Sequence, residues 1–478
     1  MSEQNPKHQP IGASHSLTIR LRLLHEPGML GKVLTLIGDL GIDAGAMDGG
    51  DMVDGAVERD ITVFLHSRQQ GVELLDALAK LAGVTVVASS DPVQRMHLGG
   101  KVEVTPRRPI NNRDDLSQAY TPGVARICMD IYADPKKAYN LTWKGNTIAI
   151  VTDGSRVLAL GNIGPLAGLP VMEGKAMLFK RFGNVNAVPI VLNTQDPEEI
   201  IRTVKAISPG FGGVNLEDIA SPGCWDIERR LQAELDIPIF HDDQHGTAVV
   251  VLAATINAAK RTKKQLRNLK VVVSGVGAAG MACCRLLIAA GVRNIVGFKR
   301  EGAIYKGRTD MNVEEQWLAE HSNPKGFKGT MKEALKGADM FLGLSVGGIL
   351  DAEDLKDMRA NSIVFALANP QPEVDPRAAE KYAKIIGTGG SEYPNQINNA
   401  LVFPGIFRGA LDARVPQITE QMKLEAARAL AAVIPPKLLR DDFIIPSIFD
   451  DRVHEAVANA VRNAAHSTGE ARRVRRLK

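Results

Sequence analysis

Residues 270–291 constrain the fold of this chain most strongly, because they combine a strand, a glycine turn and a helix. They read KVVVSGVGAAGMACCRLLIAAG and contain the pattern G-x-G-x-x-G. Glycines in this pattern permit a tight turn and let the backbone approach a pyrophosphate, which the free N–H groups of the helix N-terminus then bind. The segment therefore predicts a dinucleotide site in a Rossmann-type, doubly wound parallel sheet. The expected cofactor-binding residues of the turn are Gly275, Gly277, Ala278, Ala279 and Gly280.

The end of the next expected strand, residues 294–298, indicates which dinucleotide binds. An NAD site usually has an acidic residue there, about twenty residues beyond the turn, that accepts hydrogen bonds from ribose hydroxyls. This chain has Lys299 and Arg300, which cannot accept such bonds but can pair with a 2′-phosphate. We therefore expect NADP to be favoured and NAD to be usable. The alternative is that both side chains are ordinary surface charges on a loop.

Short apolar runs bounded by turn residues lie on both sides of the glycine turn, as expected for buried parallel strands. The runs are 148–152, 188–192, 213–216, 237–240, 269–274, 294–298, 340–344, 362–366 and 385–388. Helical spacing is clearest in 247–259, 419–433 and 451–465. We expect an α/β substrate and metal domain at 97–245, an NAD(P)-binding Rossmann domain at 246–400, and a C-terminal helical segment at 401–478 that returns to the substrate domain.

The N-terminal region has a different pattern. Residues 1–15 are polar and are expected to form a disordered arm, and residues 16–91 are expected to form a small domain. Its strands are predicted at 17–24, 42–53, 56–66 and 84–89, and its helices at 29–40 and 72–81. This β-α-β-β-α-β order is the split βαβ, or ferredoxin-like, α+β arrangement. With the segment HEPGMLGKVLTLIGDLGID it resembles an ACT domain, which implies regulation by a small effector.

Composition excludes several classes of protein. The 478 residues suggest more than one domain, and aromatic residues make up only 5%, which argues against nucleic-acid binding. The four cysteines have no spacing typical of disulfides or zinc, so we expect reduced thiols and a cytoplasmic protein. No apolar run approaches the ~20 residues of a membrane span. The last eight residues carry five positive charges of unknown role.

Residues 215–248 carry two pairs of adjacent carboxylates. The stretch reads NLEDIASPGCWDIERRLQAELDIPIFHDDQHGTA and contains Glu217, Asp218, Asp242 and Asp243. Two such pairs brought face to face need a divalent cation or a lysine between them, and oxygen ligands suit Mg²⁺ or Mn²⁺. The alternative is that Glu217 and Asp218 cap the following helix. The segment H-D-D-Q-H lacks the glutamate of a zinc-protease motif, so its histidines are expected to support the site.

Five further blocks of the sequence carry polar residues among apolar ones. They read SQAYTPGVA (117–125), GSRVLALGNIG (154–164), LPVMEGKAMLFK (169–180), VFALANPQPE (364–373) and PNQINNALVFPG (394–405). With the acidic stretch, they closely resemble malic enzyme of the smaller bacterial type over residues 97–465. The resemblance implies oxidative decarboxylation of L-malate to pyruvate and CO₂, with Mg²⁺ or Mn²⁺ and NAD or NADP, in a homo-oligomer.

The resemblance also implies a role for individual residues. It implies that the metal ligands are Glu217, Asp218 and Asp243. The implied catalytic residues are Lys175, Tyr120 and Asp242, and Asp242 is expected to hold the lysine. The implied substrate-binding residues are Arg156, Asn369 and Asn399, and Asn369 is also expected to bind the cofactor. Two features depart from the family pattern. One is Lys299 at the usual acidic ribose position, and the other is the ACT-like region, which most small malic enzymes lack.

The expected chemistry follows from the structure of malate. Its C2 hydroxyl and C1 carboxylate can chelate one metal ion, and a neutral Lys175 could take the hydroxyl proton while hydride leaves C2. Tyr120 could then protonate the enolate left by decarboxylation. Each residue also has a structural alternative: Lys175 as a surface lysine, Tyr120 as packing, and Asn369 and Asn399 as loop residues. Rival functions are a dehydrogenase that does not decarboxylate and an inactive regulatory protein.

Overall fold

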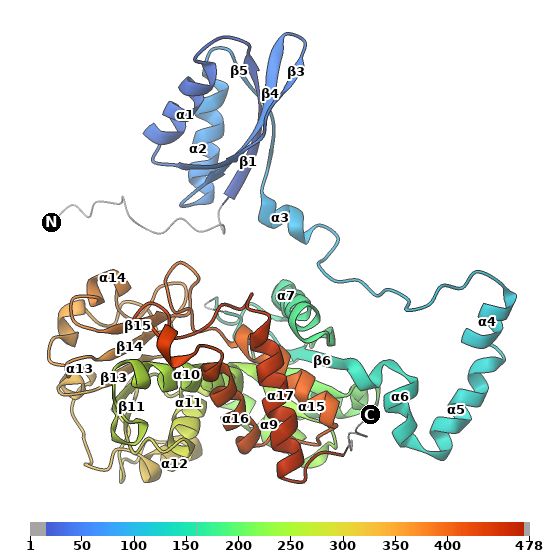
Figure 1. Cartoon of the computed structure of the whole chain (residues 1–478), viewed down its shortest axis with the longest axis vertical. Coiled ribbons are helices and arrows are strands. Elements are labelled where there is room, and N and C mark those ends of the chain that lie inside the picture. The colour runs from blue at the N-terminus through green and yellow to red at the C-terminus, as the bar shows by residue number, and fades with distance from the viewer. Residues whose placement is uncertain (1–15, 159, 473–478) are drawn as a thin grey trace. The chain divides into compact units, whose positions relative to one another are not determined.

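The computed structural model describes residues 16–158 and 160–472 (Figure 1). The chain divides into two compact units, residues 1–103 and 104–478, called here the N-terminal unit and the main unit. The arm expected at 1–15 and residues 473–478 of the basic tail lie outside the described residues. Within the described ranges, no helix is both long and apolar enough to cross a membrane.

The N-terminal unit is an antiparallel sheet with two helices, followed by a short third helix. Its strands pair in the order β2-β4-β1-β5, and β3 pairs with β4. The elements are β1 (Ser16–Leu24), α1 (Met29–Asp39), β2 (Asp43–Met47), β3 (Asp51–Val53), β4 (Ala56–Phe64), α2 (Arg68–Ala79), β5 (Val84–Ser90) and α3 (Pro92–His97). The predicted strand at 42–53 is split into β2 and β3, because Gly50 between them has a left-handed φ of 87°, which interrupts extended backbone.

The sheet of the N-terminal unit has one apolar and one charged face. Helices α1 and α2 lie on the same side of it (Figure 1) and cover buried residues such as Leu21 and Ile61. Alternate residues of β1 point to the opposite face of the sheet. There Arg20 forms an ion pair with Asp60, the residue directly opposite it on β4. The observed arrangement is an α+β region with the predicted order of elements.

The main unit contains a four-stranded parallel sheet in the order β7-β6-β8-β9. Its elements are β6 (Thr147–Thr152), α7 (Pro165–Gly183), β7 (Asn186–Val191), α8 (Pro197–Ile207), β8 (Gly213–Leu216), α9 (Gly223–Glu234) and β9 (Ile239–His241). The chain builds outwards in both directions from the central pair β6 and β8. Loops that leave such a pair diverge at the carboxyl ends of the strands, where a crevice for ligands forms.

A second sheet of the main unit has the order β12-β11-β10-β13-β14-β15, parallel except for β12. Its elements are β10 (Lys270–Ser274), α11 (Ala278–Ala289), β11 (Asn294–Lys299), β12 (Gly302–Ala303), α12 (Val313–His321), α13 (Met331–Leu335), β13 (Met340–Gly343), β14 (Ile363–Ala366), α14 (Pro376–Ala379) and β15 (Ile385–Thr388). This confirms the parallel cofactor sheet. The two-residue edge strand β12 was not expected, since it is too short to produce a periodic pattern.

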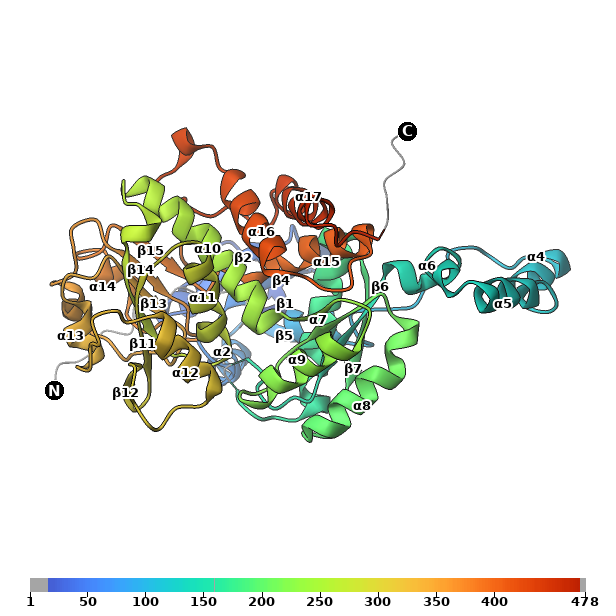
Figure 2. The same ribbon diagram turned by 90° about the horizontal axis from the view of Figure 1, so that it is seen from below.

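Long helices pack between and beside the two sheets (Figure 2). They are α10 (Asp242–Arg261), α15 (Phe403–Ala413), α16 (Glu420–Ala432) and α17 (Arg452–Ser467). Helix α10 packs on α11 and α16, and α15 packs on α17 and on α7. Helix α10 begins at Asp242, before the predicted start at residue 247, so Asp242 and Asp243 lie in its first turn.

Helices α4 (Arg113–Ala119) and α5 (Gly123–Ala133) pack on each other and are followed by the short α6 (Ala138–Leu141). Neither α4 nor α5 has a buried residue. Both views draw the pair outside the sheets and long helices of the main unit (Figures 1 and 2). Several of its apolar side chains are exposed, including Leu116 at 48%, Met129 at 61% and Tyr132 at 82%.

Candidate active site

Three carboxylates meet where β8 ends and α10 begins. Glu217, Asp218 and Asp243 each offer an oxygen, and these oxygens lie within 4.8 Å of one another. Consecutive side chains of an extended chain point to opposite sides, but Asp218 has a left-handed φ of 54°, which breaks that alternation just after β8. The backbone N–H of Asp218 donates to Asp243 Oδ2 at 2.9 Å and ties the two segments together.

Lys175 of α7 is buried beside these carboxylates. Its Nζ donates to Asp242 Oδ2 at 2.6 Å and also pairs with Glu217. The same Nζ lies 4.5 Å from the centre of the Phe403 ring. Lys175 thus contacts a second carboxylate, Glu217, besides the expected Asp242.

The charge state of Lys175 differs from the neutral base suggested by the sequence. Burial by itself would lower the pKa of Lys175, but the nearby charges of Asp242, Glu217 and Asp243 raise it above the ordinary lysine value. In this arrangement Lys175 is an ammonium ion. A neutral amine therefore requires that part of the surrounding negative charge be neutralised by another group.

The carboxylates carry more negative charge than Lys175 can balance. Burial, followed by repulsion from Asp243, raises the pKa of Asp218 to about 7. Burial likewise raises the pKa of Glu217 and of Asp242, against the opposing effect of Lys175. Asp218 Oδ2 is also buried and has no hydrogen-bond partner within the described ranges. A dense oxygen cluster with an unpartnered buried oxygen fits a divalent cation such as Mg²⁺ or Mn²⁺.

Residues that sequence reasoning missed hold this cluster in place. Asn215 Nδ2 donates to Glu217 Oε2 at 2.8 Å. Ser155 Oγ donates to Asp153 Oδ1 at 2.6 Å and accepts from the N–H of Ala220 at 2.8 Å, so it joins the loops that follow β6 and β8. A signal for Asn215 was present, because it is a polar residue inside the buried run 213–216.

Arg156 and Asn399 are also brought to the cluster. The N–H of Arg156 donates to the carbonyl oxygen of Asp218 at 3.0 Å, and a Cβ placed on Gly277 would lie 4.0 Å from Arg156 Nη1. Arg156 therefore lies between the carboxylates and the glycine turn. A Cβ on Gly246 would lie 3.2 Å from the Cβ of Asn399, which places Asn399 beside the first turns of α10.

Asn369 and Tyr120 are placed differently. Asn369 follows β14 on the cofactor sheet, where its Nδ2 would lie 2.9 Å from a Cβ on Gly389. Tyr120 ends α4 and is 68% exposed. In the described part of a single chain, the Tyr120 side chain forms no hydrogen bond with Lys175 or the carboxylates. The sequence grouped Tyr120 with Lys175, and one chain does not bring them together.

The glycine turn after β10 has the geometry that the motif predicts. Gly275 has a φ of 89°, and a Cβ on it would lie 2.6 Å from the carbonyl oxygen of Leu344, which follows the neighbouring strand β13. A Cβ on Gly280 would overlap the carbonyl oxygen of Gly275. Only glycine allows these close approaches. The turn lies at the point where the order of strands reverses, between β10 and β13.

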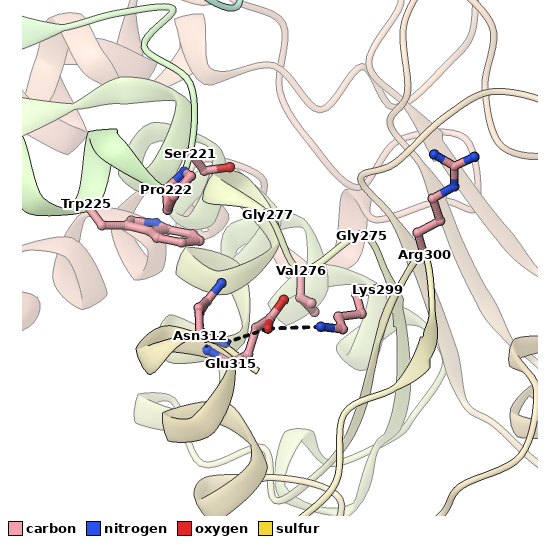
Figure 3. Close-up of a pocket in the computed structure, with 10 residues that line it drawn as sticks. All are labelled: Ser221, Pro222, Trp225, Gly275, Val276, Gly277, Lys299, Arg300, Asn312 and Glu315. Atoms are coloured by element: carbon pink, nitrogen blue, oxygen red, sulfur yellow. Dashed lines mark hydrogen bonds and ion pairs between the residues drawn. The ribbon is translucent and has the colours of Figure 1, made fainter. Parts of the chain in front are cut away.

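A pocket opens beside this turn (Figure 3). It is lined by Ser221, Pro222, Trp225, Gly275, Val276, Gly277, Lys299, Arg300, Asn312 and Glu315. Ser221, Pro222 and Trp225 come from the loop and helix that follow the metal-ligand candidates Glu217 and Asp218. The cofactor pocket and the carboxylate cluster are therefore joined by one short segment of chain.

Lys299 is already paired within the pocket. Its Nζ donates to the carbonyl oxygen of Asp310 and lies 3.3 Å from Glu315 Oε2. Glu315 Oε2 also accepts from the N–H of Asn312 at 2.9 Å, so it is fixed in a helix capping box. Arg300 is exposed, and its guanidinium points away from Lys299 and Glu315 (Figure 3). The sequence missed Glu315, whose signal was the capping pattern Asn-x-x-Glu at 312–315.

Comparisons with known proteins match most of the chain. Residues 99–232 match the family described as "Malic enzyme, N-terminal domain", and residues 244–466 match "Malic enzyme, NAD binding domain". The NAD-dependent malic enzyme of Geobacillus stearothermophilus is 52% identical over 97% of this chain and 97% of its own length. The NADP-dependent malic enzyme of Halomonas elongata is 44% identical over 78% of this chain and 92% of its own length.

Solved structures agree with these matches. The crystal structure of malic enzyme from Pyrococcus horikoshii has a TM-score of 0.76 and 47% identity, and covers 79% of this chain and 89% of that protein. The NAD-dependent malic enzyme from Thermotoga maritima has a TM-score of 0.75 and 45% identity, and covers 78% of this chain and 99% of that protein.

Proposed function

We propose a role for each site residue of this chain, which belongs to the malic enzyme family and catalyses the oxidative decarboxylation of malate with NAD or NADP. The observation that carries the proposal is the buried Lys175, held between Asp242 and Glu217 beside two further carboxylates. A buried ammonium ion among excess carboxylates forms a site whose charge changes when a cation binds. That property suits proton transfer from a substrate hydroxyl held beside Lys175.

Glu217, Asp218 and Asp243 are proposed to bind Mg²⁺ or Mn²⁺. The ion, when bound, acidifies the C2 hydroxyl of malate and polarises the C2 carbonyl formed by oxidation. Because Glu217 Oε2 also accepts from Asn215, the ligand oxygen is held in a fixed direction. The exposed side chain of Arg156, next to this cluster, is proposed to bind a carboxylate of the substrate. Asn399, beside the first turns of α10, is proposed to bind the substrate as well.

Lys175 is proposed to take the proton of the C2 hydroxyl, and a nicotinamide bound at the glycine turn would supply the hydride acceptor. Its pKa is raised first by Asp242 and then by Glu217 and Asp243, two of the carboxylates that are proposed to bind the metal. A cation held by Glu217 and Asp243 would offset part of that negative charge, which would lower the pKa of Lys175 and let its amine serve as a base. Asp242 keeps one hydrogen bond to Nζ and so orients the amine.

Tyr120 of one chain is proposed to protonate C3 of the enolate in the active site of a second copy of the chain. Helices α4 and α5 have no buried residues, and their apolar side chains lie exposed. Such a pair needs a partner surface, and a symmetric dimer supplies one by exchange of identical arms. The site then combines Tyr120 of one chain with Lys175 of the other, in a homodimer.

Lys299 and Arg300 are expected to favour NADP, but Glu315 opposes this preference because it pairs with Lys299. A 2′-phosphate on Lys299 must displace Glu315 from its pairing, whereas ribose hydroxyls can donate to Glu315 directly. We propose that both cofactors are used and that Glu315 favours NAD. Of the two relatives above, one is NAD-dependent and the other is NADP-dependent, so the family includes users of each cofactor.

The N-terminal unit is proposed to be an ACT-like regulatory domain. Its strand order and its pair of helices on one face of the sheet support this. The 97% coverage of the Geobacillus relative means that this relative has a matching N-terminal region. A small effector bound to the unit is proposed to tune turnover.

The assigned roles predict how two inactive variants behave together. Lys175→Ala should lower pyruvate formation from malate, Mn²⁺ and NAD by at least about a hundredfold, since general acid–base groups contribute about 10²–10⁴, while cofactor binding is kept. Tyr120→Phe should also be inactive. Co-expressed, the two should recover about a quarter of wild-type activity, because half of randomly mixed dimers carry one intact site.

The controls for this experiment separate three outcomes. Lys180→Ala, an exposed lysine on the same helix, should leave activity unchanged. If co-expression restores nothing, Tyr120 and Lys175 do not meet across chains. If malate oxidation releases oxaloacetate and no pyruvate, the chain is a dehydrogenase that does not decarboxylate.

Glu315→Gln is expected to shift cofactor preference towards NADP by about tenfold, which corresponds to about 1.4 kcal/mol. The substitution removes the charge that competes with a 2′-phosphate for Lys299. The ratio of kcat/KM with NADP to that with NAD measures the shift. Glu301→Gln, which removes a more exposed carboxylate 4.0 Å from Lys299, is the matched control. An unchanged ratio in Glu315→Gln would refute the assignment.

Removal of residues 1–97 is expected to abolish the response of kcat/KM to effectors while pyruvate formation continues. Amino acids and small carboxylic acids are suitable probes, because the ACT resemblance implies ligands of this size. Identical kinetics and oligomeric state of the full and shortened chains in every probe would show that the unit is not regulatory.

A further inference from the structure

Glu228 is a buried carboxylate on α9 that plays no part in the roles given above. It is 5% exposed and lies on the apolar face of the helix with Cys224, Ile227 and Leu231. A carboxylate in such a place is costly unless every oxygen has donors. The donors to Glu228 therefore identify the segment that this carboxylate holds in place.

All but one of the donors to Glu228 come from the junction of β9 and α10. Oε1 accepts from the backbone N–H of His241 at 2.9 Å. Oε2 accepts from Gln244 Nε2 at 3.1 Å and from His245 Nε2 at 3.0 Å. The remaining donor is Gln232 Nε2, on the same helix, at 3.2 Å.

The hydrogen bonds continue beyond His245 to a third helix. Lys423 of α16 lies with its Nζ 3.2 Å from His245 Nδ1. Because an ammonium can only donate and a carboxylate can only accept, His245 accepts at Nδ1 and donates from Nε2. The chain Lys423–His245–Glu228 thus connects α16, α10 and α9 in one direction.

The segment held by Glu228 is the one that carries two of the site carboxylates. His241 precedes Asp242 and Asp243, and Gln244 and His245 follow them. His241 is the N-cap residue of α10, but no side chain caps this helix from the N-cap position. Glu228 therefore fixes the backbone before the two aspartates and the side chains after them.

We propose that Glu228 is a positioning residue that sets the direction of Asp243 towards the divalent cation and of Asp242 towards Lys175. This inference rests on the proposed metal site. Glu228 itself forms no hydrogen bond with the three metal-ligand candidates in the described ranges, so it acts through the start of α10. Residues that orient metal ligands typically contribute about 10–100-fold to metal affinity.

The test is a titration of the full chain with Mn²⁺, in which the electron paramagnetic resonance signal measures the concentration of free Mn²⁺. Glu228→Gln keeps the size of the side chain, but its amide nitrogen accepts from no donor, so the donors on one oxygen lose their acceptor. We expect Mn²⁺ to bind about 10–100-fold more weakly. The KM for Mn²⁺ should rise by a similar factor, while kcat at saturating Mn²⁺ changes much less.

Two reference variants separate this inference from the proposed function. Glu198→Gln removes an exposed carboxylate of α8 that pairs with Arg230 of α9, and should leave Mn²⁺ binding unchanged. Asp243→Asn removes a proposed ligand and should weaken binding strongly. If Asp243→Asn binds Mn²⁺ like the wild type, the metal site itself is wrong. If Asp243→Asn binds Mn²⁺ weakly while Glu228→Gln binds it like the wild type, the metal site stands and the positioning role is refuted.

A second variant keeps the proposal testable should Glu228→Gln fail to fold. His245→Asn removes one donor to Glu228 Oε2 and the link to Lys423, and leaves the carboxylate in place. Its Mn²⁺ affinity should fall in the same direction, with a smaller change than in Glu228→Gln. Wild-type affinity in a folded His245→Asn variant would contradict the proposal.

Discussion

The pairing of buried Lys175 with Asp242 and Glu217 is the interaction on which the rest of the site depends. Removal of these charges from water costs several kcal/mol for each ion, which only close opposite charges and hydrogen bonds offset. The pair joins three elements that are distant in sequence, since Lys175 lies on α7, Glu217 follows β8 and Asp242 begins α10. The negative charge of these carboxylates and their neighbours exceeds the charge of one lysine, and this excess is the basis of the proposed cation site.

The fold places the two halves of the reaction at equivalent positions in two sheets. Glu217 and Asp218 follow β8, which belongs to the central pair of one sheet, and Asp242 and Asp243 follow its neighbour β9. The glycine turn lies between β10 and β13, the central pair of the other sheet. Arg156 is near both, because it bonds to Asp218 and approaches Gly277. A short segment from Ser221 to Trp225 connects the cation site with the cofactor pocket.

Local patterns in the sequence were sufficient for most of the strands, for the glycine turn and for the expectation that the carboxylates cluster. Gly280 has a local steric reason, its closeness to the carbonyl oxygen of Gly275, and Gly275 has a left-handed φ. The apolar runs report burial directly. The second partner of Lys175 is 42 positions away in the sequence, and Glu315 is 16 positions from Lys299. Glu228 likewise depends on Gln244, which is 16 positions away on a neighbouring helix. Such contacts are set by packing, which leaves no periodic signal. The sequence does not show that Tyr120 and Lys175 are apart within one chain. Its local patterns report burial within a chain, and they carry no signal for contacts between two chains.

The most direct test of this account is the pKa of Lys175, measured by nitrogen-15 NMR of selectively labelled lysine with and without Mg²⁺. The account predicts an ammonium signal that persists well above pH 10 in the metal-free protein, and a substantial fall of the pKa when Mg²⁺ binds at Glu217, Asp218 and Asp243. The Asp243→Asn variant should show little change on addition of Mg²⁺. A pKa of Lys175 that is the same with and without Mg²⁺ would contradict the account, because the lysine would then not sense the charge of the metal site.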